Sequence, residues 1–137
     1  MGNRRSLTKV VLSNTAVSST TVYTSSWFPM DSFVAVGGQV VFSGTNTGTL
    51  IAEFSYDVVP DLVSAQPPVN FNTASISVNS AIAASIAINS ATATTYSFEV
   101  GSGNGGAMSA NWIRIKYTNA TLTGTLVSAT IVGKNAG

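Results

Sequence analysis

The residues of this chain that could do acid–base chemistry are five carboxylates, because the sequence contains no His and no Cys. Without these residues there are no disulfides, no thiolate nucleophile and no imidazole base or ligand. Glu53 and Asp57 share one face of a predicted strand, about 13 Å apart, whereas glycosidase carboxylates lie roughly 5 to 9.5 Å apart. A pairing of either acid with Glu99 across a sheet stays open. We expect no catalytic residues, no metal site and no enzyme activity.

A glycine-rich segment at residues 101–106, GSGNGG, matches the G-x-G-x-x-G pattern of dinucleotide-binding loops and follows a predicted strand. That pattern binds a pyrophosphate because a helix N-terminus follows the loop. Here the chain continues through Ala107, Met108 and Ser109 into another predicted strand, and no acid follows at about twenty residues. We therefore interpret the segment as a loop between strands and expect no cofactor.

Charge is scarce and unevenly distributed. Of 137 residues, 45% are hydrophobic and 8% are charged, so hydroxyl and amide side chains supply most of the polarity. The acids lie between Asp31 and Glu99, and the bases lie near the two ends: Arg4, Arg5, Lys9, Arg114, Lys116 and Lys134. A basic arm at residues 1–10 is expected to pair with the acidic middle of another copy or with an acidic neighbour. The alternative is a solvated terminus.

Nucleic acid and membranes are not expected as partners. Three cations in the arm are too few for firm nucleic-acid binding, because each phosphate contact adds only a small, salt-sensitive increment. No apolar run approaches the length of a membrane span, and the run at residues 10–12 is too short for a secretory signal. The length suits one domain, which we place at residues 11–137 after the arm.

Period-two alternation is the dominant pattern and predicts half-buried strands. Residues 48–57 carry Glu53 and Asp57 on one face. The other face is apolar and consists of Leu50, Ala52, Phe54 and Tyr56. Residues 39–43 predict the preceding strand, and the connector at 44–48 has the length of a hairpin loop, so these two strands are expected to be antiparallel neighbours.

Three later segments alternate in the same way, at residues 94–100, 111–118 and 125–132. The inward side chains predicted for the first two are Tyr96, Phe98, Val100, Ile113, Ile115 and Tyr117. The outward face of residues 111–118 carries Trp112, Arg114 and Lys116. We expect its two cations to form cross-strand pairs with outward acids, each contributing a few tenths of a kcal/mol.

The segment at residues 73–94 contains a weak repeat, in which residues 76–81 are echoed by 86–91. Each copy alternates and contains an Asn-Ser pair, which predicts a meander of short strands, with a helix over residues 81–88 as the alternative. The proline-containing residues 59–71 predict an irregular loop, the segment best placed to reach a partner. About eight to ten strands indicate an all-β fold, a single antiparallel β-sandwich or jelly roll.

Two tryptophans are candidates for contact with a partner. Trp27 begins a short apolar run, residues 27–30, that is either a surface anchor or part of the core. Trp112 lies beside Arg114 and Lys116, a composition typical of interface hot spots, but a core position is equally compatible with the pattern. An exposed Trp could also stack on a sugar.

Residues 111–134 carry a Trp, then Arg114, Tyr117-Thr118, a polar turn, Gly124-Thr125-Leu126 and a closing Gly133-Lys134. This segment resembles the C-terminal hairpin of small β-sandwich virion proteins of tailed bacteriophages. The strand from Gly48-Thr49 to Ser55-Tyr56-Asp57 is similar to their middle strand. The resemblance covers about a quarter of the chain. It implies a capsid decoration or cement protein, a head fibre or a tail component, and it brings no enzymatic residues.

The resemblance, together with the charge distribution, leads to one main hypothesis. The chain would be a decoration protein on the capsid surface of a virion, made in the host cytoplasm. It would bind the major capsid protein or another virion protein and form a homo-oligomer, with a trimer as our guess. Its contacts would use Arg4, Arg5, Lys9, Trp27, Trp112, Arg114 and Lys116. The alternative is a tail or fibre module that adsorbs to host-surface carbohydrate through Trp27 or Trp112.

Overall fold

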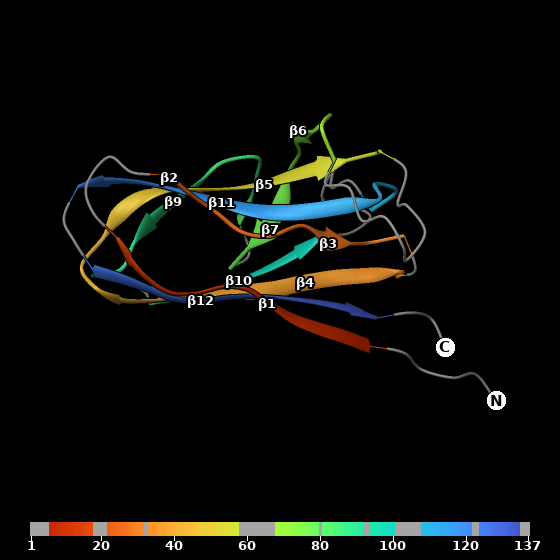
Figure 1. Ribbon diagram of the computed structural model, residues 1–137. Coiled ribbons are helices and arrows are strands. Elements are labelled where there is room, and N and C mark those ends of the chain that lie inside the picture. Colours follow the sequence, from red (N-terminus) through yellow and green to blue (C-terminus); the bar gives the residue numbers. More distant parts are fainter. Residues whose placement is uncertain are drawn as a thin grey trace.

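Two antiparallel β-sheets pack face to face in the computed structural model (Figure 1). The structure describes residues 6–17, 22–31, 33–57, 68–79, 81–91, 94–100, 108–121 and 124–134. Every regular element within these ranges is a strand. The expected all-β sandwich is therefore confirmed for the described residues, and this part of the chain holds no helix that could cross a membrane.

The strands divide into two sheets, which we call sheet A and sheet B. Sheet A contains, in spatial order, β1 (Ser6–Val17), β12 (Gly124–Lys134), β4 (Ala35–Gly44), β10 (Thr95–Val100), β7 (Ile76–Val78) and β8 (Ala81–Ala83). Sheet B contains β2 (Val22–Thr24), β11 (Trp112–Thr121), β5 (Thr47–Ser55) and β6 (Asn72–Thr73). Two further short strands join it, β3 (Phe28–Pro29) beside β11 and β9 (Ile86–Asn89) beside β5.

The strand pairs are nested from the chain ends inward. β1 pairs with β12, β2 and β3 pair with β11, β4 pairs with β10, and β5 pairs with β9. Ladders between β12 and β4, and between β11 and β5, join these pairs into the two sheets. A double-stranded ribbon wound over two sheets in this way is the jelly-roll form of the sandwich. β6, β7 and β8 are inserted between β5 and β9 and widen both sheets.

The core lies between the sheets and is built by the alternating faces that the sequence predicts. On β10 and β11 the predicted inward side chains are all buried, and so are Leu50, Ala52 and Phe54 on β5. Tyr56 is the exception among the predicted inward residues, because β5 ends at Ser55 and the Tyr56 side chain is 61% exposed. Alternation thus identifies the core as far as the strands themselves extend.

The sequence predicts two hairpins, and both predictions are wrong. Residues 35–44 lie in sheet A as β4, whereas residues 47–55 lie in sheet B as β5, so these strands are not neighbours. In the same way β11 and β12 belong to opposite sheets, so the segment at 111–134 is not a hairpin. Each connector crosses from one layer to the other. Its length suits a hairpin loop equally well, because connector length alone does not say which sheet the next strand joins.

The crossing between β4 and β5 is held by a buried polar cluster. Gly44 has φ 78°, in the left-handed region that glycine adopts without steric cost. Asn46 is fully buried, and its backbone N–H donates to Ser90 Oγ at 2.6 Å. The Ser90 hydroxyl donates to the Gly44 carbonyl at 2.9 Å, and the Ser90 N–H donates to the Asn46 carbonyl at 2.9 Å. Ser90 follows β9, so it ties the crossing between β4 and β5 to the crossing between β9 and β10.

The segment at residues 73–94 forms strands, as expected, and no helix occurs among its described residues. β7 and β8 pair with each other in sheet A, but β9 crosses to sheet B and pairs with β5. The meander prediction therefore holds only for the first two strands. The repeat in the sequence corresponds to two strands, β7 and β9, with a similar pattern of burial, in which Ile76, Val78, Ile86 and Ile88 are all buried. It does not indicate which sheet each strand joins.

The expected basic arm overlaps with β1. Residues 6–10 pair with β12 from Lys134 to Thr130, so the strand starts inside the segment assigned to the arm. Arg4 and Arg5 lie outside the described residues, as do the glycine-rich segment 101–106 and residues 59–67 of the proline-containing loop.

We predict that Ser90→Ala destabilises the fold by about 1 to 3 kcal/mol, because it leaves the buried Asn46 N–H without its acceptor. Urea denaturation monitored by tryptophan fluorescence measures the change. Ser43→Ala is the control, since the Ser43 side chain is exposed at the same connector, and it should change stability by less than about 0.5 kcal/mol. Equal stabilities of the two variants would contradict a structural role for the Ser90 hydroxyl.

Candidate functional site

Arg114 lies at the centre of a cluster on the outer face of sheet B. It stands directly opposite Glu53 in the β11–β5 ladder. On the other side of β11, Phe28 of β3 pairs with Ile113 and points into the core. Trp27, one residue earlier, lies on the outer face against Arg114. Strand register therefore brings Trp27 and Arg114, both candidate contact residues from the sequence, together with Glu53.

The contacts of the Arg114 guanidinium are ionic and aromatic. Its Nε donates to Glu53 Oε1 at 2.7 Å, which confirms the expected cross-strand pairing for this acid. Its Cζ lies 4.4 Å from the centre of the Trp27 ring and 4.5 Å from that of Phe71. The two rings are 5.7 Å apart and tilted by 59°. The Glu53 side chain is only 7% exposed, so this pair is shielded from solvent far more than a surface ion pair.

Trp112 is a packing residue of the subunit. It is 8% exposed, and its Nε1–H donates to the backbone carbonyl of Asp57 at 3.2 Å. The Asn111 side-chain amide donates to the same carbonyl at 3.0 Å and to that of Tyr56 at 3.2 Å. Trp112 is therefore buried within the subunit, although it does not belong to the core cluster that contains its neighbour Ile113. The indole fixes the chain where it leaves β5.

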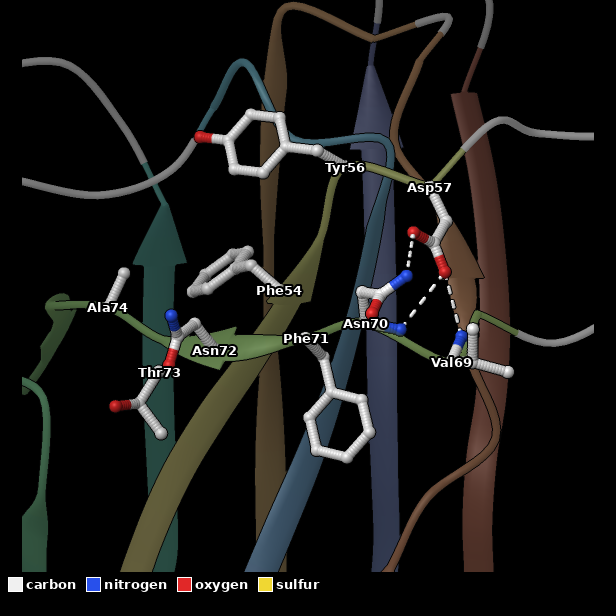
Figure 2. A pocket seen from close by; sticks show the side chains of 9 residues that line it. All are labelled: Phe54, Tyr56, Asp57, Val69, Asn70, Phe71, Asn72, Thr73 and Ala74. Atoms are coloured by element: carbon white, nitrogen blue, oxygen red, sulfur yellow. Dashed lines mark hydrogen bonds between the residues drawn. The ribbon is translucent and has the colours of Figure 1, made fainter.

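The carboxylate of Asp57 fixes a second segment at the same corner. Its Oδ2 accepts the backbone N–H groups of Val69 at 2.7 Å and Asn70 at 3.0 Å. Its Oδ1 accepts from the Asn70 side-chain amide at 3.1 Å, as Figure 2 shows. These hydrogen bonds lower the pKa of Asp57 below its usual 3.8. The backbone N–H of Asn70 contributes most, followed by that of Val69 and then by the Asn70 side chain. The anchored segment leads directly to Phe71, which contacts Arg114.

The two carboxylates that were candidates for acid–base chemistry thus have structural partners. Glu53 is paired with Arg114, and Asp57 accepts three hydrogen bonds from the chain. Glu99 faces outward on β10 in sheet A, whereas Glu53 lies in sheet B. No group of three or more acidic, His or Cys side chains within the described ranges is arranged to hold a metal ion.

The remaining candidates lie apart from this cluster. Lys9 is exposed on β1 in sheet A. Lys116 is partly exposed on β11, two residues beyond Arg114. Trp27 is partly exposed, with its ring against Arg114 and Phe71. Trp112 is buried, so among the two indoles it is Trp27 that keeps some exposure to solvent.

Sequence analysis missed the role of residues 69–74. Residues 69–71 belong to the proline-containing loop, 59–71, that was expected to reach a partner, but Val69, Asn70 and Phe71 contact the chain's own β5 and β11 corner. No local pattern marks them, because their partners Asp57 and Arg114 are 12 to 43 positions away in the sequence. The alternation of polar residues with one Phe at residues 70–73, NFNT, is the sign in the sequence that indicates a short strand here.

No protein-family model, no curated protein and no solved structure gives a significant match to this chain. The class that the fold defines is a jelly-roll β-sandwich.

We predict that Arg114→Met destabilises the protein by about 3 kcal/mol, because it leaves the buried Glu53 carboxylate unpaired. Glu53→Gln combined with Arg114→Met should cost less than the sum of the two single changes by about 1 to 2 kcal/mol. Urea denaturation of the four proteins measures this coupling. Lys116→Met, on the same face, is the control and should lie within about 0.5 kcal/mol of the starting protein. Additivity of the two changes would contradict the pairing.

We also predict a pH effect at Asp57. Because its folded pKa is lowered, the stabilisation is complete well above pH 3.8 and is lost as the pH falls below that value. The backbone amide NMR signals of Val69 and Asn70 should therefore titrate with a midpoint below 3.8. Asp57→Asn should abolish this titration, and Asp31→Asn should leave it intact. A midpoint at or above 3.8 would show that the carboxylate does not hold this segment.

Proposed function

We propose that the chain is a virion structural protein of a tailed bacteriophage, most simply a capsid decoration protein that forms a homo-oligomer on the shell. The observation that carries the proposal is the open edge of β1. Residues 6–10 are all exposed, and the edge includes Leu7 at 41% and Val10 at 57% exposure. Exposed apolar edge strands are sites where another chain adds to a sheet.

The first five residues of this edge are open. β1 is the outermost strand of sheet A beside β12, and no described strand pairs with its other side. The ladder with β12 shifts register between Val10 and Leu12, and the Val11 carbonyl accepts the Ser26 N–H at 3.1 Å. The chain itself therefore contacts this edge at Val11, while residues 6–10, with Lys9 among them, remain available to a neighbour.

Two further observations support the proposal. Jelly rolls are a common scaffold of viral capsid proteins, although fold analogy alone does not define a function. The resemblance of residues 111–134 and 48–57 to small phage virion proteins now falls on β11, β12 and β5, which are central strands of the two sheets. Trp112 and Arg114 make their contacts within the subunit, so we assign the contact between subunits to the β1 edge and Lys9.

In this proposal the protein has no catalytic task. Copies on the capsid surface would join neighbouring major capsid proteins, or other virion proteins, by burying the β1 edge and its apolar side chains. Closed symmetry, such as a trimer, would place the same edge in every contact.

The proposal predicts that the polypeptide is a stoichiometric component of purified phage particles. Quantitative mass spectrometry of particles from a phage that encodes the chain measures its copy number. Particles produced with a stop codon in its gene should lack it and lose their genome at a lower temperature. A particle inventory without this polypeptide would rule the proposal out.

The contact itself can be tested with the same particles. Leu7→Lys combined with Val10→Lys should abolish self-association in sedimentation velocity and reduce binding to undecorated particles at least tenfold. Ile82→Lys is the matched control, because Ile82 is exposed on β8 at the opposite edge of sheet A, and it should behave as the starting protein.

A further inference from the structure

A groove lies at the corner of the sandwich where β5 ends and the segment at residues 69–74 crosses beside it (Figure 2). Its volume is about 600 Å³, within the range of small-molecule sites in proteins. Asn72 stands opposite Phe54 in the β5–β6 ladder, so both side chains point to the same side of sheet B. The groove is therefore the continuation of the inner face of this sheet beyond the closed core.

The aromatic part of the groove is held in place. Phe54 forms its floor and is 2% exposed, whereas Tyr56 stands at its rim with 61% exposure. The Tyr56 hydroxyl is 3.1 Å from Ser109 Oγ, and the Tyr56 carbonyl accepts from the Asn111 side-chain amide. Since both ends of the residue are anchored, the ring is a preorganised exposed surface. Preorganisation lowers the entropic cost of binding a ligand against it.

The polar part of the groove consists of the side chains of Asn70, Asn72 and Thr73. The Asn70 side-chain amide donates to Asp57, but no described residue hydrogen-bonds the side-chain amide of Asn72. Figure 2 shows this amide beside the Phe54 ring, on the side of the groove opposite Tyr56. An amide presents two donors and an acceptor, which suits a ligand with neighbouring hydroxyl groups.

The charge of the groove selects against anions. Asp57 is the one charged side chain among the residues that line it, and its oxygens already accept three hydrogen bonds from Val69 and Asn70. The carboxylate therefore offers little to a cationic ligand and repels an anionic one. A ligand for this site should be uncharged, with one apolar face and several hydroxyl groups.

We propose that this groove binds a neutral saccharide, with the apolar face of one sugar ring on Tyr56 and its hydroxyl groups on Asn72. The inference goes beyond the proposed structural role and does not depend on it, because the groove and the β1 edge belong to different sheets. It also differs from the tryptophan sites considered in the sequence, since the exposed aromatic surface here is a tyrosine.

The full chain can be tested on an array of neutral oligosaccharides built from glucose, galactose and N-acetylglucosamine, together with the sialylated form of each. We expect binding to at least one neutral glycan and weaker binding to its sialylated form. Isothermal titration with that glycan should show at least a tenfold loss of affinity for Tyr56→Ala and for Asn72→Ala. Tyr56→Phe keeps the ring and the carbonyl anchor but loses the contact with Ser109, so it should lose less affinity than Tyr56→Ala.

Gln39→Ala is the matched control for Asn72→Ala, because Gln39 is an exposed amide on β4 in the other sheet. Its affinity should be unchanged. NMR titration of the unaltered protein provides a measurement independent of any variant, and the Asn72 side-chain amide and Tyr56 ring signals should shift first. Absence of glycan binding at millimolar concentration, a preference for the sialylated forms, or shifts confined to other residues would overturn the inference.

Discussion

Hydrogen bonding of the backbone where the chain crosses between sheets is the constraint on which this structure depends. In a hairpin, the two strands satisfy each other's peptide groups, but a connector that changes layers must find other partners. Here the buried Asn46 peptide uses the Ser90 hydroxyl, and Ser90 in turn binds the Gly44 carbonyl. Because these groups come from two crossings, β4 to β5 and β9 to β10, each crossing depends on the other. The nested pairing of strands follows from connections of this kind.

A second set of interactions holds the opposite end of β5, and it is electrostatic. Trp112 and Asn111 bind the backbone at Asp57, the Asp57 carboxylate binds Val69 and Asn70, and the following Phe71 covers Arg114. Arg114 in turn neutralises the buried Glu53. Three of the eleven charged side chains, Arg114, Glu53 and Asp57, are thus engaged within the subunit on sheet B. The two surfaces proposed for partners each carry one charged side chain: Lys9 on the open β1 edge, and Asp57, already hydrogen-bonded, in the groove.

The part of the site that could be predicted from the sequence is which side chains of each strand point outward. Alternation placed Arg114 and Glu53 on outward faces, and opposite charges on neighbouring strands favour pairing, so their ion pair was expected. The same alternation could not say that Trp27 and Phe71 would cover that pair, because these residues are brought in by β3 and by a segment without a repeating pattern. Tyr56 was assigned to the core by period alone and is exposed because the strand ends one residue earlier.

The sequence by itself determined the class of fold, the position of most strands and the composition of the core, because strand periodicity is a local property that neighbouring residues specify together. The tertiary structure alone decided which strands are neighbours. A connector such as residues 44–47 can close a hairpin or cross the sandwich, and the outcome depends on distant groups such as Ser90, which supply or withhold its hydrogen bonds. Strand pairing is therefore settled by long-range contacts, and with it the jelly-roll order, the open β1 edge and the groove beside Tyr56.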